Sequence, residues 1–426
     1  MISQTGYPRN GLGLRGNVAH EMSKHYRLKF LGLSLAALLG MSSCTLVPGS
    51  PGAERVETGG PLAGSSAPSG DTQYFPGFRP VSGVSVDSAQ AEAGTVFLGS
   101  VFPGNGRADL SFYGFNAAKT AWRVDTNPSC VGTVVTEVNG EPAVVILDSD
   151  ARTDGQGPVS VVVATAFAAD DAEVLWGPTR VPGPSAGSGL IFTDTPKALT
   201  ADPPPGVLLD ADTGAVVEVG TGTALYEHHG TALAGSETSF SALDTGSGNI
   251  LWSSADLRRP AGADPEAAVR FTGAYGPSTG GIVVLEWDAG DAEPVPVAYS
   301  LRSGEELGQV PGEPAAAAAV DEATGTVLLT SEARNGSRVL RAFRPGAGLL
   351  WRKSFDEARV SSIGGGAVFA LLNGVAARID VESGAILDTG DARLPVSVLP
   401  NGTALFPTRK QSTFALAVPD GPAGNG

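Results

Sequence analysis

Hydrophobic positions after about residue 75 come in short runs of β-branched, aromatic and leucine residues, each bounded by Gly, Pro, Asp or Asn. Runs of this kind are typical of β-strands joined by tight turns. No long stretch has the 3.6-residue periodicity of an amphipathic helix, and the alanine run at 315–319 is the best short exception. The pattern therefore predicts an all-β domain. Its clearest runs are Thr95–Leu98, Val159–Val163, Gly281–Leu285, Thr326–Leu329 and Ala367–Leu371.

One strand–turn–strand unit recurs through this region, and its turns are rich in Asp, Ser, Thr and Gly. The turn centres are about 43 residues apart, and a period of 40–50 residues with several strands per unit is typical of β-propeller blades. Counting turns predicts eight four-stranded blades over residues 74–420, with seven blades as the alternative. The copies are 112–124, 164–176, 208–219, 240–252, 298–310, 341–353 and 377–388, followed by a half-copy at 413–421.

The half-copy has a consequence for how the ring closes. The last blade has sequence for strands at 396–399, 403–406 and 413–417, but none for a fourth. A ring of blades keeps an open edge unless the ends of the chain close it. We therefore expect a segment within 74–88 to supply the missing strand. The longer gaps near 256–270 and 286–297 are expected to be loops on one face.

Four of the five tryptophans fall at one phase of the repeat, in the strand after the turn, which favours packing between neighbouring blades over a stacking surface for a sugar or quinone. Trp287 is off-phase in an acidic stretch and is the better surface candidate. Three other copies carry Glu218, Gly308 and Asp388 at the tryptophan position. The four in phase are Trp122, Trp176, Trp252 and Trp351.

The segments Asp244-Thr245-Gly246-Ser247-Gly248-Asn249-Ile250-Leu251-Trp252 and Asp212-Thr213-Gly214 resemble the pyrroloquinoline-quinone-like (PQQ-like) propeller repeat. The resemblance covers roughly 75–420 and implies architecture, not function. Quinoprotein dehydrogenases with this repeat use vicinal cysteines and a calcium site, whereas the cysteines here are Cys44 and Cys130 alone. Loss of tryptophan from several copies is common among non-enzymatic members, so no cofactor is expected.

The N-terminal region has the features of an export signal. Lys24, Arg27 and Lys29 precede ten apolar residues, Phe30–Leu39, which are too few to span a bilayer as a helix. Met41-Ser42-Ser43-Cys44 then resembles the lipobox of bacterial lipoproteins. That resemblance implies a signal peptide over 1–43, with Met22 as an alternative start, and palmitate-type acylation of Cys44.

The segment that follows predicts a tether. Residues 44–73 are dominated by Gly, Pro, Ser, Ala and Thr and cannot bury enough apolar surface to fold, and 421–426 reads as a disordered tail. Two acyl chains on Cys44 would attach the protein stably to a membrane. We therefore expect a lipid-anchored protein on the extracytoplasmic face of the cell membrane. Cys130 would then have no partner for an internal disulfide.

Composition argues against several kinds of chemistry. The net charge of −16 makes nucleic acid an unlikely partner, because the surface repels phosphate backbones. His228 and His229 are the only histidines after Cys44, and adjacent strand residues point to opposite faces, so a turn or strand edge is expected there and no metal site. No catalytic, cofactor-binding or metal-binding residue is predicted. Three acidic groups are expected to be solvated loops: Asp148 with Asp150 and Asp154; Asp170, Asp171 and Glu173; and Glu286, Asp288, Asp291 and Glu293.

These observations lead to one favoured function and one alternative. The favoured function is a non-catalytic binding or scaffolding protein, anchored to the membrane through Cys44, whose partner is an envelope protein of unknown identity. The alternative is an extracellular hydrolase or a small-ligand sensor that uses the central channel of the propeller. An enzyme is the less favoured interpretation.

Overall fold

The computed structural model describes residues 54–56, 73–102, 110–116, 120–126, 132–153, 158–186, 189–193, 206–220, 222–236, 239–264, 268–273, 281–290, 292–310, 317–409 and 412–420. Contacts divide the chain into two units, Met1–Thr45 and Leu46–Gly426, and every described residue belongs to the second. The predicted signal peptide, the tail, Cys44 and Cys130 lie outside the described residues. Among the residues that are described, no helix is long and apolar enough to cross a membrane.

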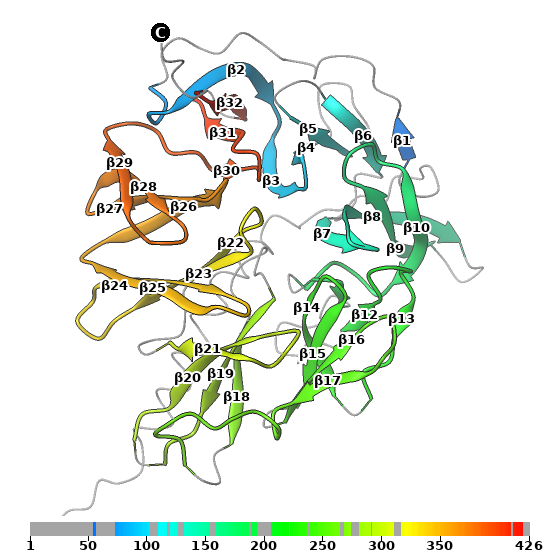
Figure 1. Ribbon diagram of the computed structural model, residues 1–426. Coiled ribbons are helices and arrows are strands. Elements are labelled where there is room, and N and C mark those ends of the chain that lie inside the picture. Colours follow the sequence, from blue (N-terminus) through cyan, green and yellow to red (C-terminus); the bar gives the residue numbers. More distant parts are fainter. Residues whose placement is uncertain are drawn as a thin grey trace, which may run out of the picture. The chain divides into compact units, whose positions relative to one another are not determined.

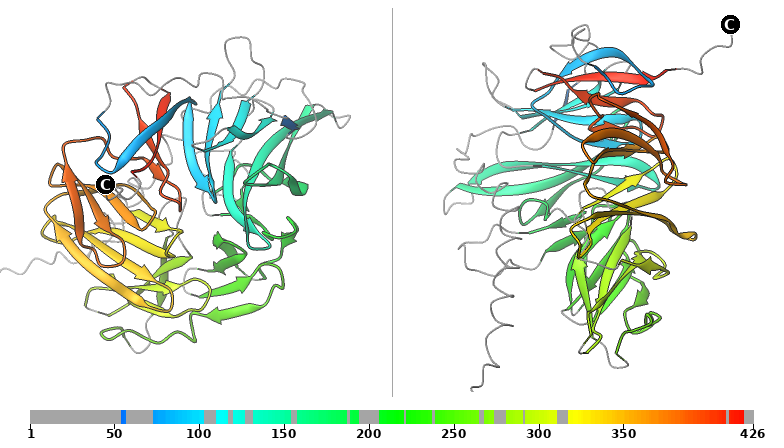
Figure 2. Two further views of the ribbon diagram at one scale, coloured as in Figure 1. Left: turned by 45° about the horizontal axis from the view of Figure 1, so that its top comes forward. Right: turned by 90° about the vertical axis from the view of Figure 1, so that its left-hand side faces the viewer.

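The described residues form 32 strands in eight antiparallel sheets, which we number as blades 1–8 in chain order (Figures 1 and 2). Blade 1 contains β3 (Ser88–Ala93), β4 (Val96–Val101), β5 (Leu110–Phe115) and β6 (Thr120–Thr126), with β1 (Glu54–Val56) added beside β6. Blade 2 contains β7 (Thr133–Val138), β8 (Glu141–Thr153), β9 (Pro158–Ala168) and β10 (Val174–Val181). Blade 3 contains β11 (Ile191–Phe192), β12 (Val207–Leu209) and β13 (Val216–Val217). Blade 4 contains β14 (Thr223–His228), β15 (Thr231–Gly235), β16 (Phe240–Asp244) and β17 (Ile250–Ser253).

Blade 5 contains β18 (Val269–Gly273), β19 (Ile282–Trp287), β20 (Val295–Ser300) and β21 (Glu306–Gln309). Blade 6 contains β22 (Ala317–Asp321), β23 (Thr326–Glu332), β24 (Arg338–Arg344) and β25 (Gly348–Phe355). Blade 7 contains β26 (Ala358–Gly364), β27 (Ala367–Leu372), β28 (Val375–Asp380) and β29 (Ile386–Gly390). Blade 8 contains β30 (Ser397–Val398), β31 (Ala404–Pro407) and β32 (Thr413–Pro419), completed by β2 (Phe78–Ser85).

This architecture confirms the predicted eight-bladed, all-β propeller. The repeated strand–turn–strand unit corresponds to the third and fourth strands of each blade, as in β16–β17 and β28–β29. The first strands of neighbouring blades contact one another (β3 with β7, β22 with β26, β26 with β30), so they line the axis, and the fourth strands form the outside. The first strand of blade 1 also contacts that of blade 8, which closes the ring.

The strand that completes blade 8 comes from the N-terminal side, as predicted. β2 pairs antiparallel with β32, from Phe78 opposite Pro419 to Ser85 opposite Thr413. A short strap before β2 holds the same junction, because the Phe75 N–H donates to the Arg393 carbonyl oxygen at 3.1 Å. The open edge expected of a half-copy is thus paired.

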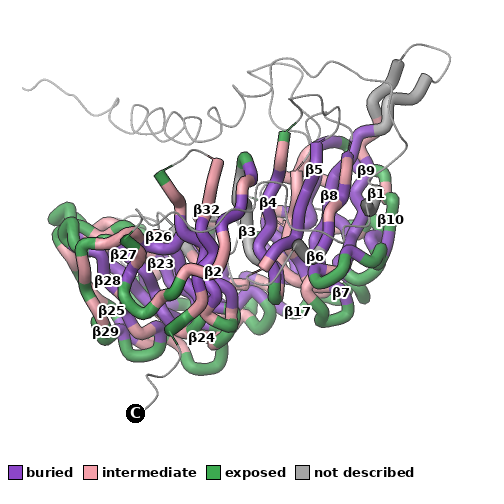
Figure 3. Tube along the Cα trace, turned by 90° about the horizontal axis from the view of Figure 1, so that it is seen from above, coloured by how far each residue is buried: buried purple, intermediate pink, exposed green. Residues whose placement is uncertain are grey.

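The apolar core is divided among the junctions between blades. Eight clusters of buried side chains are present, and each joins two neighbouring blades. In one, Phe97 of blade 1 packs with Leu405 of blade 8; in another, Leu98 packs in the cluster that contains Phe167 of blade 2. Burial of one such side chain contributes about 1.5–3 kcal/mol. Stability therefore depends on neighbouring blades more than on any single sheet, and exposure concentrates at the turns (Figure 3).

The four in-phase tryptophans lie between blades, as predicted. Each tryptophan is buried. Each indole N–H donates to a backbone carbonyl oxygen at the start of the turn that precedes the outermost strand of the next blade. The bonds run from Trp122 to Ala169 at 2.6 Å, from Trp176 to Ala211 at 2.7 Å, from Trp252 to Leu301 at 2.7 Å and from Trp351 to Val381 at 2.8 Å. The tryptophans thus link blade 1 to 2, 2 to 3, 4 to 5 and 6 to 7.

The turn that receives each indole explains the Asp–Gly pattern. In blade 3, the Asp210 carboxylate accepts the Thr213 N–H at 2.9 Å, and the Gly214 N–H donates to the Asp210 carbonyl oxygen at 2.8 Å. Gly214 has a φ of +67°, and a Cβ there would lie 2.3 Å from Trp176. Glycine is therefore required both by the left-handed backbone and by the indole packed against it.

Several local features differ from prediction. The predicted linker contains β1, because the outer edge of β6 offers an unpaired strand to which three residues bond. Among its described residues blade 3 has three strands, and a single bridge, Ser185 with Phe192, stands where a first strand would be. The described part of the alanine run, 317–319, belongs to β22 and not to a helix. The two long gaps do form loops that lie together, since the Asp264 N–H donates to the Asp288 carbonyl oxygen at 3.0 Å.

Candidate functional site

Trp287, the better surface candidate among the five tryptophans, is buried and is therefore not a surface residue. It ends β19, and its indole N–H donates to the Tyr299 hydroxyl at 2.9 Å. Burial raises the pKa of Tyr299 to about 12. The phase of the repeat did not reveal this packing, because Trp287 lies on the second strand of its blade and the other four tryptophans lie on the fourth.

His228 and His229 form a stacked pair at the inner end of blade 4. His228 is the last residue of β14 and His229 lies in the turn that follows, which confirms the predicted turn or strand edge. The expected opposite orientation was wrong, because His229 has a φ of +44° and this turns its ring onto that of His228. The ring centroids are 3.8 Å apart.

His229 is the centre of a group that we call the axial cluster: Glu137, His229 and Glu322. Glu137 lies on β7 of blade 2, and Glu322 follows β22 of blade 6, so three alternate blades contribute from their innermost strand or the turn beside it. His229 Nδ1 lies 3.2 Å from Glu137 Oε1. Two blade repeats separate each member from the next in sequence, and the ring brings their charges within reach of one another.

The charges within this cluster are strongly coupled. Burial opposes protonation of His229, but the Glu137 hydrogen bond and the nearby Glu137, Glu322 and Glu227 carboxylates raise its pKa. The same hydrogen bond lowers the pKa of Glu137, and burial raises that of Glu322. Burial, with repulsion from His229, lowers the pKa of His228 to about 3. The pair therefore combines one imidazole whose protonation is favoured by the neighbouring carboxylates with one whose protonation is opposed by burial.

Neighbouring carboxylates bond to the backbone between blades. Glu227 is buried; its Oε2 accepts the Leu190 N–H at 2.7 Å and its Oε1 accepts the Gly230 N–H at 2.9 Å. It therefore joins blade 3 to blade 4, and burial raises its pKa. Asp210 makes a similar link, accepting the Thr245 hydroxyl at 3.0 Å. These groups stabilise the junction of blades 3 and 4.

The three acidic groups expected in solvated loops behave differently. Asp170, Asp171 and Glu173 are exposed in the turn of blade 2, as predicted. Asp148 is buried within β8, so a solvated loop was wrong there: β8 is 13 residues long and continues through it. In the third group, Asp288 and Glu293 are exposed and Glu286 is half-buried in β19, whereas Asp291, like Asp154, is not described. Within the described ranges, no three His, Cys, Asp or Glu side chains are placed to hold a metal ion.

Large apolar side chains are exposed on the outside of the ring, and the sequence analysis did not identify them. We call this set the apolar rim. Its members are the first one or two residues of five outermost strands, directly after the turn, and they are between 39% and 67% exposed. The sequence signal is the apolar residue or pair between the turn glycine and the tryptophan position. The members are Val174, Leu175, Val216, Ile250, Leu251, Leu349, Ile386 and Leu387.

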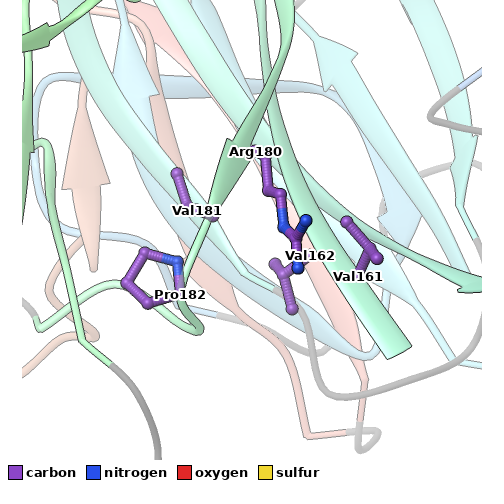
Figure 4. Close-up of a pocket in the computed structure, with 5 residues that line it drawn as sticks. All are labelled: Val161, Val162, Arg180, Val181 and Pro182. Atoms are coloured by element: carbon purple, nitrogen blue, oxygen red, sulfur yellow. The ribbon is translucent and has the colours of Figure 1, made fainter. Parts of the chain in front are cut away.

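A shallow pocket of about 290 Å³ lies on blade 2 beside β9 and β10 (Figure 4). It is lined by Val161, Val162, Arg180, Val181 and Pro182. A single guanidinium is the only charged group in this lining, which provides neither an acid–base pair nor a ligand set. We assign it no function.

No known protein family matches the sequence, and no curated protein matches it. Among solved structures, the β-propeller domain of Cps50 (Swd1) from Myceliophteria thermophila has a TM-score of 0.38 and 11% identity, covering 80% of this chain and all of that one. A chain of the mitotic checkpoint complex also has a TM-score of 0.38, with 8% identity, covering 86% of this chain and all of that one. Similarity at this level carries no argument about function.

Proposed function

We propose that this chain is a non-catalytic binding or scaffolding protein of the bacterial cell envelope, anchored by lipid at Cys44 with its propeller on the extracytoplasmic side. β-Propellers commonly serve as scaffolds for protein interaction, because a rigid ring supports surfaces that vary independently of the fold. The resemblance of Met41–Cys44 to a lipobox supports the anchor, and the resemblance to PQQ-like repeats supports a non-enzymatic relative of those proteins.

The apolar rim is the observation that carries this proposal. Exposed apolar residues scattered singly need no explanation, whereas this set recurs at one position of five blades, and we take the recurrence as support for a binding role. The ring closes through β2 and the blades pack through eight buried clusters without these side chains. Their exposure therefore contributes nothing to the fold, and contact with another protein would bury them.

The bonding of the polar groups near the axis agrees with a non-catalytic role. Glu227 accepts two backbone N–H groups, and His229 pairs with Glu137. Groups held in this way stabilise the junctions between blades. The alternative of a hydrolase or small-ligand sensor in the central channel would use the same side chains, so it predicts that Glu137→Gln abolishes a ligand response while the protein stays folded.

Lipidation is tested on the protein expressed in a bacterial host. The mature chain should begin at Cys44 and carry acyl mass, globomycin should block its processing, and Cys44→Ser should release it from the membrane fraction. A membrane-bound mature protein without acyl mass on Cys44 would contradict the anchor.

The binding role is tested by photocrosslinking in intact cells. A photoreactive residue at Ile250 or Ile386 should give a discrete, reproducible adduct, and one at Asn401, an exposed turn position, should not. Equal crosslinking from rim and turn positions, or none from any rim position, would contradict a scaffold that uses the rim.

A further inference from the structure

Four of the eight junctions have no tryptophan, and one of these, between blades 3 and 4, is open at the position that an indole fills elsewhere. A Cβ built on the turn glycine of blades 3, 5 and 7 would lie 2.3, 2.9 and 2.8 Å from Trp176, Trp252 and Trp351 respectively. Gly248 of blade 4 has the same turn geometry, with a φ of +69°, yet a Cβ there would meet no described atom within 4 Å. The space that an indole occupies at three junctions is open beside Gly248.

The strand register explains why this space is open. In blade 4, a register shift between Ile250 and Trp252 directs the tryptophan toward the next blade. Blade 3 has no such shift: Val216 pairs with Leu209 and Val217 with Leu208. Val217 therefore takes the place on its strand that Trp252 takes in blade 4, and Glu218 lies one residue beyond it. A valine side chain at this place fills less space than an indole. We call the space bounded by Val217, Thr245 and Gly248 the vacant slot.

Two other junctions without tryptophan are occupied by charged groups of the chain itself. At Gly346 of blade 6, the backbone N–H donates to a Glu305 carboxylate oxygen of blade 5 at 3.2 Å. In blade 7, Asp388 stands at the tryptophan position and pairs with Arg378 at 2.5 Å. The vacant slot has no comparable group among the described residues, and it is flanked by Val216 and Ile250 of the apolar rim.

Charge defines the second property of this surface. Residues 206–257, which form most of blades 3 and 4, contain seven Asp or Glu residues and no Lys or Arg. Glu218, which directly follows Val217, is exposed. Charge complementarity therefore favours a ligand that combines an aromatic side chain with positive charge.

We propose that the vacant slot docks a partner segment in which a tryptophan is flanked by basic residues, an inference that rests on the proposed binding role and places it between blades 3 and 4. The partner indole lies against Gly248 as Trp252 lies against Gly304. Its N–H donates to the carbonyl oxygen of Thr245. This residue has the same position in the blade 4 turn as Leu301, the acceptor for Trp252, has in the blade 5 turn. The basic neighbours contact Glu218.

The chain itself supplies a suitable probe. The peptide GLLWRKS, which copies residues 348–354, contains the tryptophan that fills the junction of blades 6 and 7, followed by Arg and Lys. Its binding to the purified chain is measured by fluorescence anisotropy of a dye-labelled peptide, and GLLARKS is the matched control. We expect the tryptophan peptide to bind at least tenfold more tightly than the control, and binding to weaken several-fold as salt rises.

Two variants locate the binding. Val217→Trp places an indole in the slot and should weaken peptide binding at least tenfold, whereas Val375→Trp, at an exposed position on blade 7, should leave it unchanged. Glu218→Lys changes only an exposed side chain and should also weaken binding, which keeps the test decisive if Val217→Trp misfolds. Equal binding of both peptides, or binding unaffected by Val217→Trp and Glu218→Lys, overturns the proposal. Crosslinking from Ile386 on blade 7 does not depend on the slot. It therefore tests the proposed binding role separately from the peptide experiment.

Discussion

The turn glycines provide a matched pair of substitutions that separates backbone strain from steric conflict. Gly214 and Gly248 occupy the same position in the turns of blades 3 and 4, with φ values of +67° and +69°. Alanine at either position must adopt the left-handed region, which costs about 1–2 kcal/mol. At Gly214 the new methyl would also lie 2.3 Å from Trp176, whereas at Gly248 it meets nothing within 4 Å.

Overpacking a well-packed site costs a further 1–3 kcal/mol, roughly. We therefore expect Gly248→Ala to lower the free energy of unfolding by about 1–2 kcal/mol, and Gly214→Ala by about 2–5 kcal/mol. Urea unfolding followed by far-ultraviolet circular dichroism and by tryptophan fluorescence measures both, with coincident transitions as the check on two-state behaviour.

A double-mutant cycle identifies the source of the difference. In a Trp176→Leu background the contact with the indole is absent, so the cost of Gly214→Ala should fall to that of Gly248→Ala. Equal losses for the two glycine variants in the wild-type background, or an unchanged loss in the Trp176→Leu background, would refute packing of the indole as the reason for glycine.

Three further predictions concern pH, the indole hydrogen bonds and ring closure. The pKa of His228 is about 3 in the folded protein and near 6.5 in the unfolded chain, so the stability that it contributes is complete above about pH 6.5 and declines as the pH falls toward 3. The melting temperature of His228→Phe should therefore drop less than that of the wild type between pH 7 and pH 4. An equal drop would contradict the assignment. Trp252→Phe leaves the Leu301 carbonyl oxygen without its donor and should cost about 1–3 kcal/mol in urea unfolding, whereas a loss below about 0.5 kcal/mol would show that the bond adds nothing. Deleting residues 74–86 removes β2 and exposes the edge of β32, so size-exclusion chromatography should show aggregation or unfolded monomer, and a compact, cooperatively melting monomer would contradict closure by β2.

Local turn chemistry explains how much of the fold was predictable. Asp244 and Gly248 mark a turn whose bonds involve only neighbouring residues, so the repeat, the number of blades and the phase of Trp252 follow from the sequence. Closure was also predictable, because a half-copy at the end of a ring requires a strand from elsewhere. The reduced blade 3 was not predictable, because its copy of the repeat covers the last two strands of the blade, whereas the described residues have a single bridge in place of its first strand.

The candidate site was less accessible for a different reason. Glu137, His229 and Glu322 are brought together by the ring, and nothing near each residue indicates the other two. The stacking of His228 on His229 depends on a positive φ at a histidine, which alternation along a strand does not predict. The apolar rim was present in the sequence as the apolar residues before the tryptophan position of five copies, but their exposure depends on which strand is outermost.

Closure by β2 also determines when the ring can be completed. β2 is made early in translation and its partner β32 late, and the Ser85 and Thr413 hydroxyls that meet there are 328 residues apart in sequence. Neighbouring blades can pack as they emerge, but blade 8 has no fourth strand until almost the whole chain is present. Joining such distant segments adds a loop-closure entropy that grows slowly with length and places the slowest contact at the end of folding. The ring can therefore close only when synthesis of the chain is nearly finished.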